Sequence, residues 1–349
     1  MVPPVAPGYA PGVDTRTLIE TTAASLGFVH LRVAAIPPEG TPRMQAYLAW
    51  LARGHHGEMD YLARGADVRA DPRRREPDLR SAVVLALEHH HRRPPDPGGL
   101  TGKVARYAWG RDYHNLIGKR LRKLRRRLHE AGVANWGGVD TAPILERAWA
   151  EAAGLGFTGK SCVQIVPARG SYLLLAVLFV DQALTPDAPL RDHCGRCTRC
   201  LVACPTQAFP GPRQLDATRC IAYWTIEAKG AIPLPLRASF GRWVFGCDVC
   251  QEVCPHNARP PDPDEDDLLP RHAWLDLVRL LEEPDDALMQ RFLGTPLRRP
   301  GPDGLRRNAC VVMGNLGDAA AIPPLRAAWQ RGSPLVQEHA AWALARLGG

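Results

Sequence analysis

The sequence of 349 residues predicts an α+β fold in three parts. We expect a mixed α/β domain at residues 14–190, a ferredoxin-like domain at 191–260 and α-helical HEAT-like repeats at 261–349, after a disordered leader at 1–13. Three observations support this division: helical and strand-like patterns alternate up to residue 190, eight cysteines lie between residues 194 and 254, and a helical motif recurs near the C-terminus.

The composition is that of an ordinary soluble protein, with 45% hydrophobic residues and a net charge of +8. This positive excess favours a polyanionic partner such as nucleic acid. The longest apolar run, from Tyr172 to Val180, is too short to cross a bilayer and predicts a buried strand. Because the N-terminus has no basic or apolar leader, we expect a cytoplasmic protein without membrane attachment, in which Cys162 and Cys310 are small buried residues.

The first part of the chain predicts short helices and two strands. Helical patterns cover residues 15–26 and 57–64, and strand-like runs cover 28–33 and 81–87. Thr41 followed by Pro42 is typical of a helix start, with Thr as the N-cap. Three histidines, His89 to His91, follow the second strand. Since alternate residues of a strand face opposite ways, we interpret them as a solvated strand end rather than a metal site.

The longest helical pattern runs from Asp112 to Glu130. One face carries leucines at helical spacing, which predicts an amphipathic helix packed on the core. The other faces carry seven basic residues: Lys119, Arg120, Arg122, Lys123, Arg125, Arg126 and Arg127. Two interpretations remain open for them, a solvated basic face and a track for the phosphates of a nucleic acid.

Asp140 lies at the junction between a strand-like segment and a helix that we expect to open at Thr141 and Pro143 and to run to Ala153. An aspartate at such a junction is often only the N-cap of the helix. The alternative is a general acid, because a carboxyl group beside an apolar pocket has a raised pKa and can donate a proton.

Residues 154–161, GLGFTGKS, fit the G-x-x-x-x-G-K-[ST] phosphate loop letter for letter. A phosphate loop follows a strand and opens a helix, whose N-terminus then faces the phosphates. Here a helical pattern comes before the glycines and a strand-like CVQIVP comes after them, so we do not favour nucleotide triphosphate binding.

The cysteine spacing indicates two [4Fe–4S] clusters. Residues 194–205 follow the C-x2-C-x2-C-x3-C-P pattern of two-cluster ferredoxins, and residues 247–255 repeat it with one cysteine missing, which Cys220 supplies. In that pattern the fourth cysteine ligates the other cluster. Disulfides and zinc are the alternatives, but zinc usually takes two separated pairs and leaves half of each run unexplained. The expected ligand sets are Cys194, Cys197, Cys200 and Cys254 for the first cluster, and Cys204, Cys220, Cys247 and Cys250 for the second.

The last part of the chain begins with an acidic, Pro-rich linker at residues 260–270. Residues 307–317 then align with residues 338–348, which lie 31 positions further on. A repeat of this length with small and apolar residues at helical spacing predicts paired helices of the HEAT type.

Six blocks, in this order and spacing, resemble the epoxyqueuosine reductase family. The resemblance implies a base-off cobalamin between the N-terminal and cluster domains, reduced by the clusters. It also implies removal of the epoxide oxygen of epoxyqueuosine at the wobble position of a tRNA anticodon stem-loop, with electrons from an external low-potential donor and a monomeric enzyme. The blocks are GEMDYLAR, RYAWGRDYH, VDTAPILERAWAEAAGLGFTGKS, the two cysteine runs, YWTIEAKG and LRRNACVVMGNLG.

The resemblance also assigns roles to single residues. Asp140 matches the proton donor of the family and lies at the cobalamin. The other residues expected at the cobalamin are Arg64, Lys160, Gln164 and Trp224. The residues expected at the tRNA are Glu146, Lys229, Arg306, Arg307 and Asn308.

Two other functions remain as alternatives. A cobalamin-dependent reductase of a small molecule, like the reductive dehalogenases, would share the cobalamin and the paired clusters, but it commonly has an export leader and needs neither the repeats nor the basic charge. An electron-transfer subunit without its own catalysis would not need an N-terminal part of this size.

Overall fold

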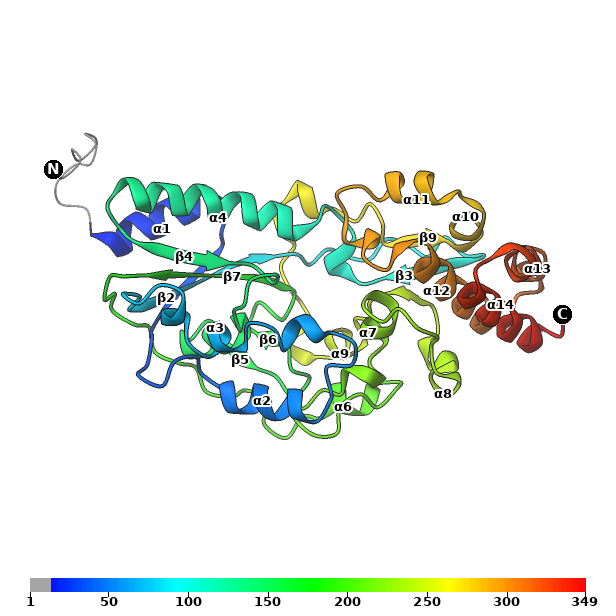
Figure 1. Cartoon of the computed structure of the whole chain (residues 1–349), viewed down its shortest axis with the longest axis horizontal. Coiled ribbons are helices and arrows are strands. Elements are labelled where there is room, and N and C mark those ends of the chain that lie inside the picture. Colours follow the sequence, from blue (N-terminus) through cyan, green and yellow to red (C-terminus); the bar gives the residue numbers. More distant parts are fainter. Residues whose placement is uncertain (1–13) are drawn as a thin grey trace.

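The computed structural model describes residues 14–349, which form an elongated molecule with the N-terminal sheet at one end and the C-terminal helices at the other (Figure 1). The predicted leader, residues 1–13, lies outside the described residues. The N-terminal sheet is antiparallel, in the order β1-β2-β7-β4. Its strands are β1 (His30–Ala35), β2 (Ser81–Glu88), β7 (Leu173–Val180) and β4 (Asn135–Gly138).

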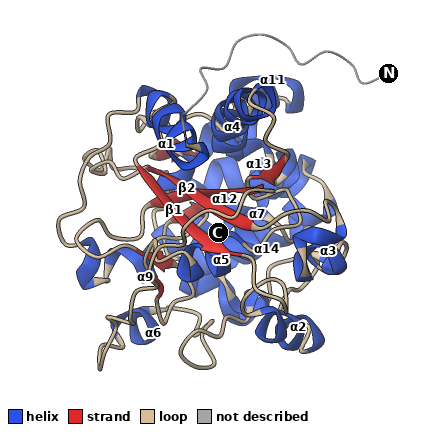
Figure 2. Cartoon of the chain, turned by 90° about the vertical axis from the view of Figure 1, so that its left-hand side faces the viewer, coloured by secondary structure: helices blue, strands red, loops and turns tan. Residues whose placement is uncertain are grey.

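Helices cover both faces of this sheet, as the end-on view in Figure 2 shows. Val83 and Leu85 of β2 pack with α1 (Thr15–Ser25) and α4 (Tyr113–Glu130), whereas Ala82 and Val84 pack with α5 (Glu146–Ala152). A strand buried on both faces is a continuous apolar run, which explains why β2 and β7 do not alternate in sequence. The predicted strands at 81–87 and 172–180 and the predicted helix at 112–130 are confirmed.

Two predicted helix starts are wrong. Helix α2 (Met44–Ala52) begins after Thr41, whose side chain is buried and does not cap it; Arg43 is the N-cap, with a left-handed backbone. Helix α5 begins at Glu146 instead of Thr141, so Asp140 is not its N-cap. In both places a proline disfavours the helical conformation of the residue before it, Thr41 or Ala142, so the helix begins only after the proline.

The expected solvated end of β2 is also wrong. His89 and His91 are buried, and His89 lies edge-on to the ring of Tyr172. Only His90 reaches a charged partner, Asp262 in the acidic linker, at 3.0 Å.

A second sheet joins segments that are far apart in the chain. Its central strand β3 (Thr101–Val104) pairs in parallel with β8 (Trp243–Phe245) and antiparallel with β9 (Trp274–Asp276). Side chains of all three strands enter one core with the C-terminal helices. None of these strands was predicted, because each is too short to show a period of its own.

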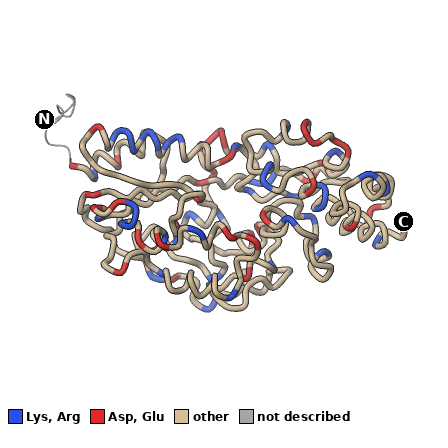
Figure 3. Tube along the Cα trace, viewed as in Figure 1, with Lys and Arg blue, Asp and Glu red and all other residues tan. Residues whose placement is uncertain are grey.

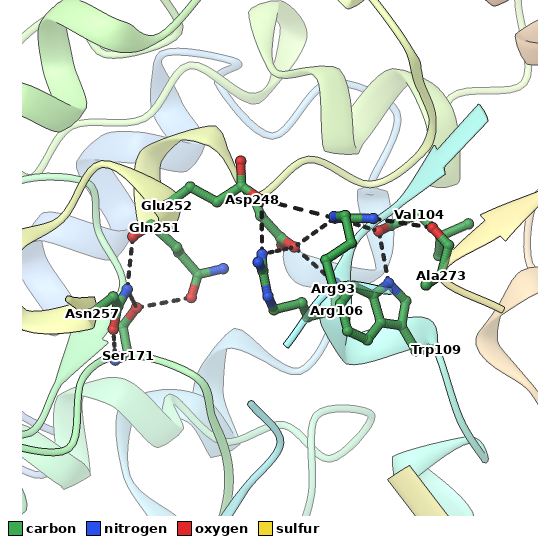
Figure 4. A network of polar contacts seen from close by, with 10 residues as sticks. All are labelled: Arg93, Val104, Arg106, Trp109, Ser171, Asp248, Gln251, Glu252, Asn257 and Ala273. Carbon is green, nitrogen blue, oxygen red and sulfur yellow. Dashed lines mark hydrogen bonds and ion pairs between the residues drawn. The ribbon is translucent and has the colours of Figure 1, made fainter. Parts of the chain in front are cut away.

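A buried polar network lies at the same junction (Figure 4). The backbone N–H of Arg106 donates to Asp248 Oδ2 at 2.8 Å, and Arg106 Nη1 contacts Glu252 Oε1 at the same distance. Arg93 lies 4.8 Å from the ring centre of Trp109 and donates to two backbone carbonyls at 3.0 Å. Because Asp248 stands between two of the cysteines, the network ties the cysteine-rich region to the N-terminal part.

The C-terminal helices form the predicted repeat. Helices α12 (Gly301–Leu316) and α14 (Pro334–Leu347) contain the two aligned segments and pack against each other in one core. Gly314 is required there, since a Cβ atom would lie 2.9 Å from Ala343 Cα. The remaining helices of this region are α10 (Leu277–Glu282), α11 (Asp285–Arg291) and α13 (Ile322–Arg331).

The acidic linker is bound to the N-terminal part rather than free. Glu265 pairs with Arg120 of α4 at 2.5 Å, and Asp267 pairs with Arg111 at 3.3 Å. Lysines and arginines recur along α4 (Figure 3), and most of them are exposed. Among the described residues, no helix has the length and apolar character that a membrane span requires.

Candidate active site

A cavity of about 460 Å³ lies where α2, α5 and the cysteine-rich region meet. Its wall is mixed, with tyrosine and tryptophan rings, aliphatic side chains and several charged groups. Such a wall suits a large organic ligand that is held by apolar contact and oriented by a few polar groups. The residues that line it include Arg43, Trp50, Tyr113, Asp140, Glu146, Arg147, Thr158, Cys162, Arg213 and Leu215.

Asp140 is held in this wall by two neighbours from the start of α4. Its Oδ2 atom accepts hydrogen bonds from Tyr113 Oη at 2.9 Å and from His114 Nε2 at 2.6 Å. Its backbone is left-handed, with φ of 48°, and its side chain is 58% exposed. Burial raises the pKa of Asp140, but the bonds from His114 and Tyr113 outweigh it and leave the pKa below its usual value. The prediction of a raised pKa for this carboxyl group is therefore wrong.

Glu146 lies beside Asp140 and also lines the cavity. Its Oε1 atom accepts the backbone N–H of Asp140 at 2.6 Å, which fixes the turn before α5. Burial and then the charge of Asp140 raise the pKa of Glu146 to about 7. The structure therefore places Glu146 among the groups that can carry a proton at neutral pH.

His114 and Tyr113 are the site residues that the sequence did not single out. Asp112, the N-cap of α4, binds the His114 backbone N–H at 2.9 Å and its Nδ1 atom at 2.7 Å. Burial lowers the pKa of His114, but hydrogen bonds to Asp112 and Asp140 outweigh it and raise the pKa to about 9. The signal was present in the sequence, since Asp-Tyr-His at a helix start places three polar groups in one turn.

The glycine-rich segment 154–161 is not a phosphate loop. It runs from the end of α5 through β5 (Phe157–Thr158), which pairs with β6 (Gln164–Ile165), and no helix follows Ser161. Lys160 Nζ donates to the carbonyls of Gly195 and Cys197 at 2.7 and 2.9 Å. Lys160 thus fastens the first cysteine run to the cavity wall.

Gln164 has a buried side-chain amide that lacks hydrogen-bond partners among the described residues. It is 4% exposed, and neither its amide nitrogen nor its amide oxygen has a hydrogen-bond partner among the described residues. It pairs in register with Thr158, which lines the cavity. An unsatisfied buried amide costs free energy unless a ligand binds it, so Gln164 fits a cofactor that carries amide groups.

The other two residues expected at the cofactor lie nearer the edge of the site. Arg64 is exposed after the short helix η1 (Asp60–Leu62) and does not line the cavity. Trp224 of α7 (Ile221–Ile226) packs against the same small apolar cluster as Cys220 and Trp50, and it donates to the carbonyl of Thr218 at 2.6 Å.

The eight cysteines are all free and half-buried. Seven lie in or beside the short helices α6 (Arg199–Ala203) and α9 (Val249–Glu252), and Cys220 is the N-cap of α7. Their thiols raise one another's pKa in two groups that share Cys200. Burial raises the pKa of Cys254, and the thiols of Cys194, Cys200 and Cys197 raise it further. Burial likewise raises the pKa of Cys250, and among the thiols that raise it further Cys220 comes first, followed by Cys204 and Cys200.

Backbone amides also reach these sulfurs. The N–H of Ala208 donates to Cys204 Sγ at 3.3 Å, and the N–H groups of Ala222 and Tyr223 lower the pKa of Cys220 against its burial. Such donors stabilise thiolates around an iron–sulfur cluster. Within residues 14–349, no three His, Cys, Asp or Glu side chains converge closely enough to hold a single metal ion. A four-iron cluster is larger and takes one thiolate at each iron.

Cys162 and Cys310 differ. Cys310 is buried in the repeat core as predicted. Cys162 is only partly buried and lines the cavity, with a left-handed backbone, so the prediction of a small core residue is wrong for it.

The residues expected at the tRNA divide into exposed and buried ones. Lys229 is exposed and donates to the carbonyl of Arg299 at 3.1 Å. Arg306 is largely covered and pairs with Asp285 at 2.6 Å. Arg307 and Asn308 are 0% and 1% exposed, so a surface role for their side chains is wrong. They donate instead to carbonyls of residues 224–230 and 244, which fixes α7 and its loop against α12.

Comparisons with known proteins agree with this architecture. The model of the 4Fe-4S double cluster binding domain matches residues 193–257, that of HEAT repeats matches 292–349, and that of epoxyqueuosine reductase QueG, DUF1730, matches 69–141. The first two matches define an iron–sulfur protein with a paired-cluster domain and a helical repeat.

The particular family follows from whole-chain relatives. Epoxyqueuosine reductase of Pseudomonas aeruginosa is 44% identical over 86% of this chain and 86% of its own, and that of Xanthomonas campestris is 39% identical over 96% and 97%. A crystal structure of epoxyqueuosine reductase with an epoxyqueuosine-modified tRNA-Tyr stem loop is 30% identical, covers 96% of this chain and 90% of that chain, and has a TM-score of 0.89. The chain belongs to the epoxyqueuosine reductase family and is an oxidoreductase.

Proposed function

We propose that this chain reduces the epoxide of epoxyqueuosine at the wobble position of a tRNA anticodon and so forms queuosine. The observation that carries the proposal is the likeness, over nearly the whole chain, to a reductase that holds an epoxyqueuosine-modified stem loop. The net charge of +8 supports an RNA partner, because phosphates attract a basic surface.

Cobalamin is the cofactor that the cavity would hold. Gln164 offers a buried amide without a partner, Trp224 and Trp50 offer apolar surface, and Lys160 holds the adjoining loop. When bound, cobalamin supplies the low-valent cobalt chemistry that opens the epoxide. Arg64 would reach the cofactor only from the rim, since it is exposed outside the described cavity.

Two [4Fe–4S] clusters would be held by the two groups of thiols. Cys194, Cys197, Cys200 and Cys254 form one set; Cys204, Cys220, Cys247 and Cys250 form the other. The grouping of the thiols around Cys254 and Cys250 supports these sets. Clusters pass single electrons, so the enzyme also needs an external low-potential donor.

Asp140 would donate the proton that turns the departing oxygen into water. It lines the cavity, and a solved epoxyqueuosine reductase of Bacillus subtilis, 29% identical with a TM-score of 0.85, has a catalytic aspartate loop swung out of its active site. In this chain Asp140 also lies on a turn, where its backbone is left-handed and its N–H donates to Glu146 Oε1. Tyr113 and His114 hold the carboxyl group in its inward position.

The RNA would meet the rim beside Asp140. Arg299 carries its guanidinium 5.6 Å from the ring of Tyr61 and pairs with Glu227 at 2.8 Å, and its carbonyl accepts Lys229 Nζ. Arg299 also lowers the pKa of Asp140, after the stronger effects of its own neighbours, so this cationic rim adjoins the proton donor. Arg307 and Asn308 would support this rim from beneath rather than contact the RNA.

The test is conversion of an epoxyqueuosine-modified stem loop by anaerobic protein reconstituted with iron, sulfide and cobalamin. We expect product from the natural chain, and at least about 10²-fold slower turnover from Asp140→Asn, which removes the proton. Asp286→Asn, an exposed change on α11, is the matched control and should be unaffected. Corrinoid binding without reduction of the RNA would instead favour a small-molecule reductase, and no corrinoid binding would favour an electron-transfer subunit.

A further inference from the structure

A second cavity, of about 360 Å³, lies beside the first between α4 and the strand β4. His114 lines this second cavity, whereas Asp140 lines the first. The hydrogen bond of 2.6 Å between His114 Nε2 and Asp140 Oδ2 therefore joins the two cavities through one shared wall. The remaining lining of the second cavity includes Gly118, Arg122, Arg125, Gly138 and Thr141.

We propose that protons reach Asp140 from this second cavity through His114, which acts as the proton relay of the reductase. The inference rests on the proposed function, because it concerns the supply of the proton that Asp140 donates. Cobalamin and an anticodon loop would together fill the first cavity, on the side of Asp140 that lies opposite His114. A route from behind would then let Asp140 be reprotonated while both ligands remain bound.

The stoichiometry of the reaction requires such a supply. Converting an epoxide to an alkene breaks two carbon–oxygen bonds, consumes two electrons from the external donor and takes up two protons, and the oxygen leaves as water. A single carboxyl group carries one proton, so Asp140 must be reloaded within one turnover unless another acid provides the second proton.

The geometry suits a transfer through the carboxyl group. Both bonds to Asp140 from Tyr113 and His114 end on Oδ2, and Oδ1 has no hydrogen bond to any described residue. The lowered pKa of Asp140 means that its carboxyl group is ionised at rest, so Oδ2 first takes a proton from Nε2 and the group then donates a proton to the substrate oxygen. Asp112 binds Nδ1 at 2.7 Å, so both ring nitrogens face carboxyl groups and the ring is held as a donor on both sides.

The charges around the ring favour its protonated form. Besides Asp112 and Asp140, the ring faces Tyr113, which stacks on it, and it shares the second cavity with Arg122 and Arg125. Tyr107, Arg299 and Glu146 act on its neighbours Tyr113 and Asp140. The two arginines of the second cavity oppose a positive ring, but the two carboxylates make direct hydrogen bonds and prevail, as the raised pKa of His114 shows.

The test compares variants that cut or block the route. His114→Gln keeps a donor for Asp140 but cannot relay a proton, and we expect about 10²-fold slower single turnover at saturating stem loop, without loss of cobalamin affinity. Gly118→Leu would fill the second cavity and slow turnover several-fold. Gly118→Ala is its control, since a Cβ atom there would meet only Arg122 Nη1, at 3.5 Å. Turnover by the natural chain should fall above pH 9, where the His114 ring loses its proton. This decrease should be absent in His114→Gln.

A second readout does not depend on activity. In cofactor-free protein, nitrogen NMR should show the His114 ring titrating near pH 9, and at lower pH in Asp112→Asn. A His114 ring that titrates near its ordinary value would overturn the relay. The relay would also be overturned if His114→Gln turned over at the rate of the natural chain while Glu146→Gln was slow. That result would make Glu146 the second acid. Absence of epoxide reduction by the natural chain would count against the proposed function, while the ring titration would still decide whether His114 is a proton store.

Discussion

The cysteine-rich region and the catalytic cavity hold their reactive groups in opposite ways. Seven of the eight cysteines stand in two short runs, so local turns of the chain bring most of them together. The cavity draws its groups from the start of α4, the turn before α5, β5 and a segment before α7, and only the tertiary fold unites them. The positions of the cluster ligands therefore depend on local spacing in the sequence, whereas the positions of the proton-handling groups depend on packing between distant elements.

Cys220 is the exception among the eight cysteines, because it lies outside both runs and only the tertiary fold brings it to the other three ligands of its set. Cys220→Ser should therefore remove one whole cluster, lowering iron from about eight to about four per chain, and abolish turnover. Iron and sulfide analysis of anaerobic protein measures this. Cys310→Ser in the repeat core is the control and should retain the full iron content; equal iron in both variants would disprove the ligand set.

Arg307 tests how far the cavity rim depends on a distant helix. Its buried guanidinium satisfies carbonyls of Trp224, Ala228 and Gly230. Arg307→Met would leave these unpaired, so we expect destabilisation of about 3 kcal/mol or more, measured by thermal or denaturant unfolding. Arg306→Met breaks a partly exposed ion pair and should cost about 1 kcal/mol or less. Similar costs for the two variants would contradict the supporting role of Arg307.

Glu146 gives the smallest expected effect, on the pH dependence of stability. Its pKa is raised from 4.5 to about 7, so the folded state holds the proton more tightly than the unfolded chain. This contribution is complete below pH 4.5 and is lost as the pH rises through about 7, by about 1–2 kcal/mol after solvent screening. Glu146→Gln should flatten this part of the stability curve. An unchanged slope would show that Glu146 is ionised at neutral pH.

The regions that were predicted correctly from the sequence are those whose structure is set by local spacing of residues. The long helix, the two buried strands, the repeat and the paired-cluster domain each carry a period or spacing that physics ties to one structure. Prediction from the sequence failed where contacts between distant segments determine the structure. The sheet of β8, β3 and β9 is made of strands without a period, and Arg307 is buried although arginine is usually exposed.

The candidate site shows the same limit. Asp140 was found from its position at a strand end, but its pKa is set by His114 and Tyr113, which lie 26 and 27 residues before it. Gln164 and Glu146 were expected from the resemblance, and their environments, an orphaned amide and a carboxyl beside Asp140, became visible only in the folded chain.

The most direct test of the account is an anomalous diffraction map of the reconstituted protein, recorded at the iron and cobalt edges with a modified stem loop bound. We predict two iron positions, one within each set of four cysteines, and cobalt in the cavity beside Asp140 with the modified base between them. Iron at only one set, or cobalt away from Asp140, would contradict the assignment of both the electron path and the proton donor.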